Sequence, residues 1–356
     1  MISLYIGSTT PYSGKSLLCM GLGKKFQKDG LSLSYLKPFG TSLTRVGDQI
    51  TDEDAVFVER ALSLDEPLEV LCPVVVTQDM IIQAYMGKMA GLEEKVLNAH
   101  KQLSQEKDLI LIGGGKNIYD GAFLGLSGVS LIKKLNAKVI LIDKYEEDVC
   151  IDCILAARES LGERLIGVIM NRVSRDSEGC LRRRAVPFLE RKGIPVLGIL
   201  PYDSVLTAVK VKELSDILNG RIICCEDRTE DLVESFSVGA MNVDSALKYF
   251  RAKKNKAVIT GGDRSDIQLA ALQTSTKCII LTGDLYPNEI IINQAEERHV
   301  PIMIVTKDTL STIEECERVL GRMRIRDERK LKRAVDLVKE RIDFERIYEK
   351  LELSLG

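Results

Sequence analysis

Short apolar runs alternate with longer segments of helical periodicity along most of the chain. The apolar runs are rich in valine, isoleucine and leucine, which is typical of strands buried on both faces of a parallel sheet. Strands that alternate with helices in this way form β-α-β units. The pattern therefore predicts an α/β fold, with a doubly wound parallel sheet followed by a smaller α/β domain.

The first 220 residues carry most of this pattern. Its predicted strands are Ile2–Ile6, Ser32–Leu36, a weak one at Val74–Val76, Leu109–Ile112, Val139–Ile142, Leu165–Met170 and Val196–Leu200. Its predicted helices are Lys15–Lys28, Asp52–Leu62, Leu92–Gln105 and Gly179–Lys192. Thr51 is the expected N-cap of the second of these helices.

We expect three segments along the chain, at residues 1–220, 221–321 and 322–356. The first should close at Asn219-Gly220, where a helix stops on a glycine. In the second, strand–threonine–glycine–helix units recur at the spacing of one βα unit, which predicts a compact three-layer domain. The third is a helical tail of alternating basic and acidic residues, for which a solvated helix or a dimer arm is favoured over nucleic-acid binding.

Composition narrows the classes of partner. Apolar residues make up 45% and charged residues 29% of the 356, with a formal net charge of −2. This balance argues against a dedicated nucleic-acid surface. No apolar run reaches the roughly 18–20 residues of a membrane helix, and the N-terminus has no signal-peptide pattern. We expect a cytoplasmic protein with neither a membrane nor a nucleic acid as partner.

Cysteines and histidines offer little catalytic chemistry. The nine cysteines are odd in number and lie mostly in apolar patterns, which favours reduced, buried thiols over a disulfide framework. Cys150 and Cys153 have redox or zinc spacing, but no second pair follows, so a structural role one helical turn apart is favoured. His100 and His299 each stand alone in a helical stretch. Zinc hydrolysis and Ser/His catalysis therefore lack their usual parts.

The strongest motif is Gly7-Ser-Thr-Thr-Pro-Tyr-Ser-Gly-Lys-Ser16, directly after a predicted strand and at the start of a helix. This is the context of a P-loop, in which backbone N–H groups and the helix N-terminus favour phosphate. Lys15 would reach the β- and γ-phosphates, and Ser16 would place its hydroxyl on Mg²⁺. Thr9 stands where the usual spacing has a glycine. The alternative is an ordinary strand–helix turn with a capping serine.

Further motifs follow this loop in a fixed order. They are Tyr35-Leu-Lys-Pro-Phe-Gly-Thr41, Asp52-Glu-Asp-Ala55, Leu111-Ile-Gly-Gly-Gly115, Gly167-Val-Ile-Met-Asn-Arg-Val173 and Gly198-Ile-Leu-Pro-Tyr202. With the P-loop, this order resembles the dethiobiotin synthetase family. It is even more similar to the dethiobiotin-synthetase-like N-terminal module of large phosphotransacetylases. The resemblance covers about residues 1–220 and implies a doubly wound parallel sheet that binds ATP and Mg²⁺.

Carried over by position, the resemblance implies roles for individual residues. Lys15 and Lys37 are the candidate catalytic lysines, and Lys37 matches the one that holds substrate carbamate and phosphate. Asp54 joins Ser16 as a metal ligand, a hard-oxygen choice suited to Mg²⁺. Asn171 matches the residue that reads adenine, with Pro201 lining the base pocket. The expected nucleotide contacts are Thr10, Ser13, Gly14, Lys15, Ser16, Leu17, Asn171, Arg172 and Pro201. The plainer alternatives are a solvated lysine at 37 and a strand-capping Asn171.

One position departs from the family. Dethiobiotin synthetases have a Mg²⁺-binding glutamate after the strand that here runs through Ile112, and this chain has Gly113. The Gly-rich loop is also altered, reading Gly114-Gly115-Lys116-Asn117. Loss of a carboxylate weakens metal binding and removes part of the carboxylation chemistry. We therefore expect this change to preserve ATP binding but not dethiobiotin synthesis.

The second segment resembles the DRTGG domain. The matching stretches are Thr260-Gly-Gly-Asp-Arg-Ser-Asp-Ile267 and Leu281-Thr-Gly-Asp284. The resemblance implies a domain that accompanies regulatory and nucleotide-handling modules and often pairs subunits, so a homodimer is expected. Its glycines would lie at the carboxyl ends of parallel strands, where α/β sheets bind ligands. The expected ligand or dimer site is Gly262, Asp263, Arg264, Thr282 and Gly283, and the alternative has Asp263 capping a helix with Arg264 exposed.

Two functions fit these observations. The first is an ATP-binding regulatory or sensor protein that dimerises through its DRTGG domain. The second is an ATP-dependent ligase or carboxylase of the dethiobiotin synthetase or cobyrinate amidation type, acting on a small-molecule substrate. Lys37 and Asp54 favour the ligase and Gly113 opposes it. The acetyltransferase domain of the long phosphotransacetylases is not found in the sequence, so we do not expect acetyl transfer from it.

Overall fold

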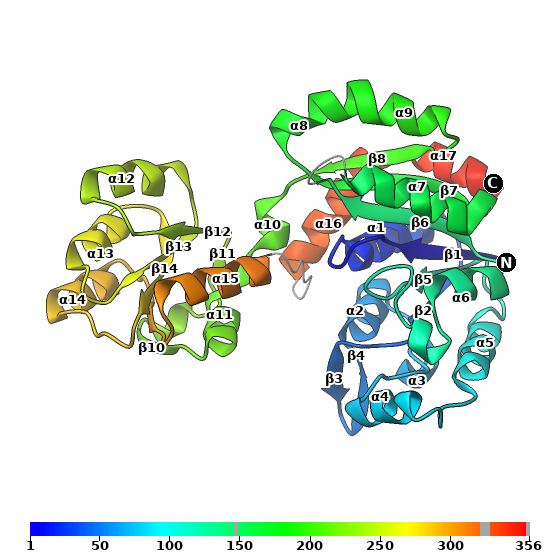
Figure 1. The fold of residues 1–356 in the computed structure, drawn as a ribbon, viewed down its shortest axis with the longest axis horizontal. Helices are drawn as coiled ribbons and strands as arrows, with labels where there is room; N and C mark the ends of the chain where they lie inside the picture. The colour runs from blue at the N-terminus through cyan, green and yellow to red at the C-terminus, as the bar shows by residue number, and fades with distance from the viewer. Residues whose placement is uncertain (146–148, 321–327, 354–356) are drawn as a thin grey trace. The chain divides into compact units, whose positions relative to one another are not determined.

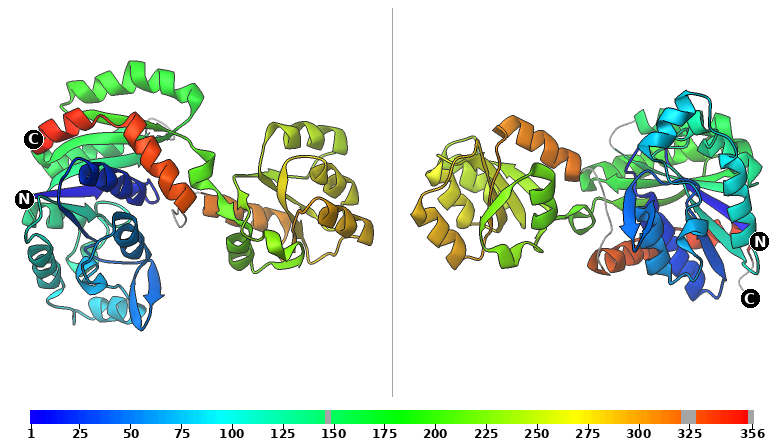
Figure 2. Two further views of the ribbon diagram at one scale, coloured as in Figure 1. Left: turned by 180° about the vertical axis from the view of Figure 1, so that it is seen from behind. Right: turned by 90° about the horizontal axis from the view of Figure 1, so that it is seen from below.

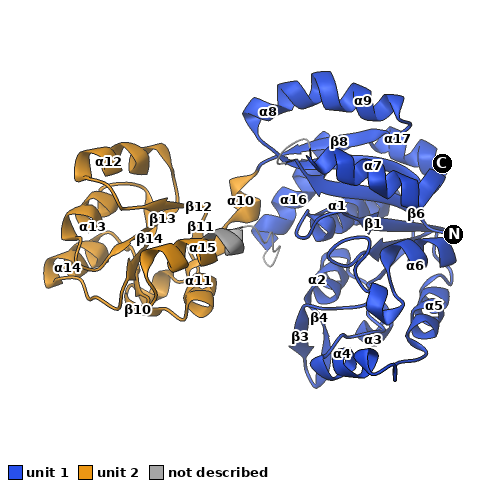
Figure 3. Cartoon of the chain, in the orientation of Figure 1, with its two compact units in different colours: residues 1–202, 325–356 blue, residues 203–324 orange. Residues whose placement is uncertain are grey.

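The chain folds into two compact units (Figure 3). The computed structural model describes residues 1–145, 149–320 and 328–353. Unit 1 comprises residues 1–202 and 325–356, and unit 2 comprises residues 203–324. In the described residues, no helix is long and apolar enough to cross a membrane.

Unit 1 is built on a six-stranded sheet of order β2-β5-β1-β6-β7-β8 (Figure 1). Its strands are β1 (Ile2–Gly7), β2 (Leu33–Leu36), β5 (Leu109–Gly113), β6 (Lys138–Lys144), β7 (Leu165–Val173) and β8 (Val196–Pro201). Every neighbouring pair is parallel. From β1 the chain goes to the edge strand β2 and returns to β5 beside β1, and it then continues on the other side through β6, β7 and β8. The predicted doubly wound parallel sheet is therefore confirmed.

Helices connect these strands and cover the sheet (Figures 1 and 2). They are α1 (Lys15–Lys28), α2 (Glu53–Leu62), α3 (Leu68–Leu71), α4 (Gln78–Tyr85), α5 (Leu92–Leu103), η1 (Ala122–Leu124), α6 (Gly128–Lys134), α7 (Val149–Leu161), η2 (Gly162–Arg164), α8 (Arg175–Cys180), η3 (Leu181–Ala185) and α9 (Val186–Arg191). The predicted helix over 179–192 is thus two α-helical segments joined by the π-helical turn η3. A hairpin of β3 (Leu43–Val46) and β4 (Gln49–Asp52) precedes α2.

Two local predictions in unit 1 are wrong. Thr51 lies inside β4, and the N-cap of α2 is Asp52, whose carboxylate accepts a hydrogen bond from the Asp54 backbone N–H. Threonine and aspartate are both good N-caps, so the residue type does not decide between them. The strand β4 extends to Asp52, and this places Asp52 at the start of the helix. The segment 74–76 is not a strand, because Val75 makes only an isolated parallel bridge with Gly40.

The charged C-terminal segment packs on unit 1. It forms α16 (Glu328–Arg341) and α17 (Phe344–Leu351). A Cβ placed on Gly21 of α1 would lie 2.5 Å from the Val338 side chain of α16, so the two helices touch closely at a glycine. The Tyr348 hydroxyl donates a hydrogen bond to Asp29, and its ring packs against Phe26 at 5.7 Å. The expectation of a solvated tail is wrong for these helices, because their apolar residues share one face and bury it.

Unit 2 is a three-layer α/β domain. Its sheet has the order β10-β15-β14-β13-β12. The strands are β10 (Arg221–Cys224), β12 (Ser235–Val238), β13 (Lys256–Gly261), β14 (Thr276–Thr282) and β15 (Ile302–Ile304), with a small pair of β9 (Val209–Lys210) and β11 (Leu232–Val233). The helices are α10 (Ser204–Thr207), α11 (Val211–Leu218), η4 (Glu226–Arg228), α12 (Val243–Ala252), α13 (Ser265–Leu272), α14 (Glu289–Glu297) and α15 (Thr309–Leu320). β10 runs antiparallel to β15, and the other neighbours are parallel.

The structure changes from one unit to the other at residue 203, whereas the sequence suggested 220. Val211, Leu214 and Leu218 of α11 are buried in the same apolar cluster as Ala257 and Ile259 of β13. The helix that ends at Asn219 therefore belongs to unit 2, and the left-handed turn at Asn219 connects it to β10 within that unit.

Candidate functional site

The motif Gly7–Ser16 forms a loop between β1 and α1. Tyr12 and Gly14 have positive φ angles of 56° and 104°, so the backbone turns sharply just before the helix. A side chain at position 14 would overlap the amide of Asn171, which adds a steric reason for glycine. No side chain caps α1, and its first turn holds no acidic residue. Its first N–H groups have no partner within the helix and favour an anion.

Asp143, at the end of β6, holds the start of this loop. Its carboxylate accepts hydrogen bonds from the backbone N–H groups of Thr9 and Thr10, at 2.9 and 3.1 Å. The Thr10 hydroxyl also donates to it, at 3.2 Å. The Ser13 hydroxyl lies 2.8 Å from that of Thr10 and donates to the Thr10 carbonyl at 2.7 Å. Asp143 is 1% exposed, and burial raises its pKa against the effect of these donors.

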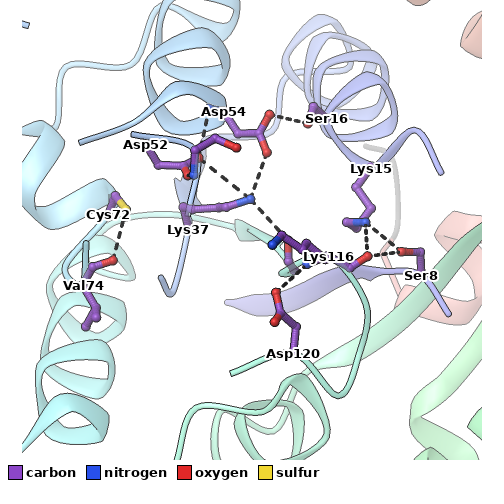
Figure 4. Close-up of polar contacts among 12 residues, drawn as sticks. Ser8, Lys15, Ser16, Lys37, Asp52, Asp54, Cys72, Val74, Lys116 and Asp120 are labelled. Carbon is purple, nitrogen blue, oxygen red and sulfur yellow. Dashed lines mark hydrogen bonds and ion pairs between the residues drawn. The ribbon is translucent and has the colours of Figure 1, made fainter. Parts of the chain in front are cut away.

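Lys15 extends from the first turn of α1 toward the end of β5 (Figure 4). Its Nζ donates to the Ser8 hydroxyl at 2.7 Å and to the Lys116 carbonyl at 3.0 Å. Burial, followed by repulsion from Lys37, lowers the pKa of Lys15 to about 8. Among the described residues no carboxylate forms an ion pair with this buried ammonium group, which favours an incoming polyphosphate.

Ser16, Asp54 and Lys37 form one network (Figure 4). The Ser16 hydroxyl donates to Asp54 Oδ1 at 2.7 Å, and Lys37 Nζ donates to Asp54 Oδ2 at 2.9 Å. Lys37 also donates to the Gly114 carbonyl at 3.3 Å and lies 3.9 Å from Asp52. Burial acts to lower the pKa of Lys37, but Asp54 and Asp52 outweigh it and hold the pKa above its usual value. Lys37 is therefore a buried cation rather than a solvated lysine.

The same residues fit a divalent cation. Burial acts to raise the pKa of Asp54, but the charge of Lys37 and the hydrogen bonds lower it, so this carboxylate is ionised. Its side chain is 41% exposed, which leaves oxygen accessible beside the Ser16 hydroxyl. No group of three or more His, Cys, Asp or Glu suited to a metal occurs in the part of the chain that the structure describes. A serine, one carboxylate, water and phosphate are the usual ligands of Mg²⁺ at nucleotide sites.

Tyr35 fills the space where a side chain at position 113 would begin. A Cβ on Gly113 would overlap the Tyr35 hydroxyl and lie 2.9 Å from its Cζ. Tyr35 is 1% exposed, and burial raises its pKa well above the usual value, so its phenol is neutral. A neutral, buried hydroxyl therefore lies against Gly113 at the end of β5. The missing acid at position 113 was noted from the sequence, but the packing of Tyr35 on Gly113 was not predicted.

Asn171 lies behind the loop, at the end of β7. Its Nδ2 donates to the Ser13 carbonyl at 2.8 Å, and its Oδ1 accepts from the Arg172 backbone N–H at 2.8 Å. The side chain is 2% exposed and supports the P-loop in this structure. Its adenine-reading role, with Pro201 at the end of β8, stays a prediction. Leu17 is buried in the core, so only its backbone is free to face a nucleotide.

In unit 2 the five predicted residues come from two adjacent strand ends. β13 and β14 are paired so that Gly261 lies beside Thr282. Gly262 packs against the Leu285 backbone so closely that a Cβ would overlap it. Arg264 donates to Asp266 at 3.1 Å and to the Met241 carbonyl at 3.1 Å. Within the chain Arg264 therefore pairs with Asp266, and Asp263 does not cap α13, whose N-cap is Arg264.

The surroundings of Cys150, Cys153 and His100 indicate structural roles for these residues. Cys150 and Cys153 lie one turn apart on α7, as predicted, with Cys150 buried. His100 Nε2 lies 2.8 Å from the Ser3 hydroxyl, and burial lowers the pKa of His100. Among the described residues, no cysteine or histidine side chain forms a hydrogen bond with Lys15, Ser16, Lys37 or Asp54.

Two domain families match the chain. The family described as an AAA domain matches residues 3–210, and the family described as a DRTGG domain matches residues 213–319. These matches confirm the predicted order of a P-loop NTPase module followed by a DRTGG domain.

The curated relatives that match the chain are phosphate acetyltransferases. The phosphate acetyltransferases of Synechocystis sp. and Pseudomonas aeruginosa are 24% and 22% identical, each over 97% of this chain and 51% of their own length. That of Escherichia coli is 23% identical over 84% of this chain and 46% of its own. The chain thus spans about half the length of the curated relatives it matches.

Solved structures resemble parts of the chain at low identity. Cobyrinic acid a,c-diamide synthase from Mycobacterium smegmatis, with a bound ATP analogue and magnesium, is 17% identical over 57% of this chain and 86% of its own, with a TM-score of 0.37. The CBS and DRTGG regulatory region of Clostridium perfringens pyrophosphatase, complexed with diadenosine tetraphosphate, is 19% identical over 41% and 74%, with a TM-score of 0.30.

Proposed function

This chain belongs to the family described as an AAA domain, and we propose that it is an ATP- and Mg²⁺-binding regulatory protein that dimerises through its DRTGG domain. ATP would bind with its phosphates over the N-terminus of α1. Turnover would be slow, and the bound nucleotide would act as a signal rather than as a consumed substrate.

The loop before α1 supports the ATP site. Glycine at position 14, free N–H groups at the helix start and the ammonium group of Lys15 together suit a polyphosphate. Lys15 would exchange its contacts with Ser8 and Lys116 for the β- and γ-phosphates. Asp143 and Asn171 would hold the loop in shape while this exchange takes place.

Ser16 and Asp54 support a Mg²⁺ ion beside the phosphates. Both oxygens lie together at 2.7 Å, and the carboxylate is partly exposed. A bound Mg²⁺ would supply charge neutralisation of the phosphate oxygens. Lys37 would hold the far side of the Asp54 carboxylate and fix its orientation.

The observation that carries slow turnover is the contact of Gly113 with Tyr35. Phosphoryl transfer depends on positioned groups that neutralise charge and orient the attacking group. The carboxylate that the resemblance implies at position 113 is missing, and the buried, neutral Tyr35 phenol fills the space beside Gly113. The Gly114 and Lys116 carbonyls that follow accept hydrogen bonds from Lys37 and Lys15. The site therefore keeps the groups that bind phosphate and lacks one that helps to place the metal.

Lys37 favours the second candidate, an ATP-dependent ligase or carboxylase. Its ammonium group is buried beside Asp52 and Asp54, near Lys15, where a lysine suits a carbamate or carboxyl phosphate intermediate. ATP consumption that rises severalfold on adding a small amine with bicarbonate, or a small carboxylate, would support this candidate. Tight binding with negligible consumption under the same conditions would support the regulatory protein.

Isothermal titration with Mg²⁺-ATP tests the nucleotide site. We expect one ATP per chain, and we expect Lys15→Ala to weaken binding by at least about tenfold, because a charge-assisted contact to phosphate is lost. Lys24→Ala, at a lysine further along the same helix, is the control and should bind as the unaltered protein does. Equal binding by the Lys15→Ala protein would remove the P-loop assignment.

A further inference from the structure

Large apolar side chains of α4 and of the loop after β5 form an exposed surface on unit 1, which we name the α4 surface. Each of them is between 45% and 80% exposed, and they are Ile82, Tyr85, Met86, Tyr119 and Phe123. The Tyr85 ring stacks on that of Phe123, with centroids 6.1 Å apart and an angle of 22° between the planes. The two segments therefore meet in one apolar surface, and surfaces of this kind mark interaction sites.

Local signals at both ends define the helix α4. The Thr77 hydroxyl accepts a hydrogen bond from the Met80 N–H at 3.3 Å. At the other end Gly87 has a φ of 67°, and the Lys88 N–H donates to the Gln83 carbonyl at 3.0 Å. No residue of α4 is buried. A helix this short gains most of its stability by packing an apolar face, and the described part of the chain leaves this face uncovered.

The two ends of the α4 surface carry opposite charges. Asp79 lies in the first turn of the helix, three residues before Ile82 and on the same side. Lys88 follows the last turn. Both side chains are exposed, and neither forms an ion pair with any residue that the structure describes. The surface is therefore apolar in its middle, acidic at one end and basic at the other.

A second copy of this chain complements such a pattern. Two copies of α4 that pack antiparallel about a twofold axis bring Asp79 of each copy opposite Lys88 of the other. The axis then passes between residues 83 and 84, and the same symmetry brings Ile82 of each copy opposite Tyr85 of the other. Because a twofold contact repeats every pairing, both the charges and the apolar side chains match twice.

We propose that the α4 surface binds a second copy of this chain in this antiparallel arrangement. The apolar side chains supply the surface that is removed from water. The Asp79–Lys88 pairs set the orientation of the two helices. This contact joins P-loop modules and is separate from the proposed DRTGG dimer and from ATP binding, so it can fail without affecting either.

Cysteine cross-linking of the full chain tests the contact. The Ile82→Cys protein is treated with a short bis-maleimide, and the covalent dimer is quantified against the unaltered chain, which measures the background from native cysteines. We expect a high yield of dimer, whereas Lys101→Cys, at an exposed position of α5, should give little. Adding Tyr85→Ser to the Ile82→Cys protein should lower the yield severalfold, because apolar contact is lost.

Charge reversal tests the orientation in the same Ile82→Cys background. Asp79→Lys and Lys88→Asp should each lower the yield of dimer severalfold, because like charges then face each other twice. The two substitutions together should restore the yield, since the pair is reversed but complementary. Thermal melting checks the fold of each protein.

Three results would overturn the proposal. The first is a yield for Ile82→Cys no higher than that for Lys101→Cys, as expected if another protein or a small molecule covers the α4 surface. The second is an unchanged yield in the two single charge reversals. The third is a failure of the double reversal to restore the yield.

Discussion

At the scale of single residues, side chains that are distant in sequence hold the nucleotide loop in shape. Asp143 binds its first N–H groups, and Asn171 binds the Ser13 carbonyl behind Gly14. Lys15 donates a hydrogen bond to the Lys116 carbonyl in the loop after β5, and the Ser16 hydroxyl donates one to Asp54. The loop is thus fixed by the ends of β5 and β6, which flank β1, and by the end of β7 beyond β6.

The contact of Tyr35 with Gly113 predicts a measurable coupling. Gly113→Ala should lower the free energy of unfolding by about 1–3 kcal/mol, because its Cβ has no space beside the phenol. The loss should be smaller in a Tyr35→Phe background, where the overlapping hydroxyl is gone. Urea unfolding of the four proteins gives the coupling. Gly179→Ala is the control, since the nearest atom there is the flexible Arg183 end at 3.4 Å. Strictly additive losses would contradict the proposed contact.

Lys15 predicts a pH dependence of ATP affinity. Its pKa is about 8 in the free protein, and bound phosphate favours the charged form, so binding takes up a proton above that pH. We expect the dissociation constant to rise by up to about tenfold per pH unit from pH 8 upward, and to be steady below it.

Titration calorimetry from pH 7 to 9.5 measures this dependence. Lys15→Arg is the comparison, because a guanidinium stays charged over the range and should remove the inflection. An inflection that persists in the Lys15→Arg protein would assign it to another group.

Helices and strands were mostly predictable from sequence, and the exceptions have physical reasons. The buried strands of unit 1 and α1 follow from apolar periodicity and from the glycine before the helix. The hairpin β3–β4 has half-exposed strands without a strong apolar pattern, so periodicity gave no signal for it. In the site, the P-loop and the Lys37–Asp54 pair could be predicted from motifs. Asp143 could have been found as an acid at the end of a predicted strand, but Tyr35 depends on pairing of β2 with β5.

The packing of α16 on α1 predicts that the C-terminal segment stabilises unit 1. Leu337 is 1% exposed, so Leu337→Ala should lower the free energy of unfolding by about 2–5 kcal/mol. Lys332→Ala, on the exposed face of the same helix, should change it by no more than about 0.5 kcal/mol. Urea unfolding measures both. If both substitutions had equal, small effects, α16 would be a solvated helix, as its charge pattern suggested.

The whole molecule combines a P-loop module with a DRTGG domain, and the regulatory proposal requires communication between them. If ATP acts as a signal, Mg²⁺-ATP should shift the monomer–dimer equilibrium of the full chain severalfold, and the Lys15→Ala protein should not respond. Sedimentation velocity across a range of protein concentrations measures the shift. If saturating ATP left the monomer–dimer equilibrium unchanged, nucleotide binding and dimerisation would not be coupled, which contradicts the regulatory proposal.

The fate of bound ATP tests the central claim most directly. The full chain is mixed with an equimolar amount of Mg²⁺-ATP, separated from free nucleotide by rapid filtration, and the retained nucleotide is identified by anion-exchange chromatography. We predict that the protein retains intact ATP over many minutes and that Lys15→Ala retains almost none. Retention of ATP by the Lys15→Ala protein, or rapid conversion of the bound ATP to ADP by the unaltered protein, would contradict the account.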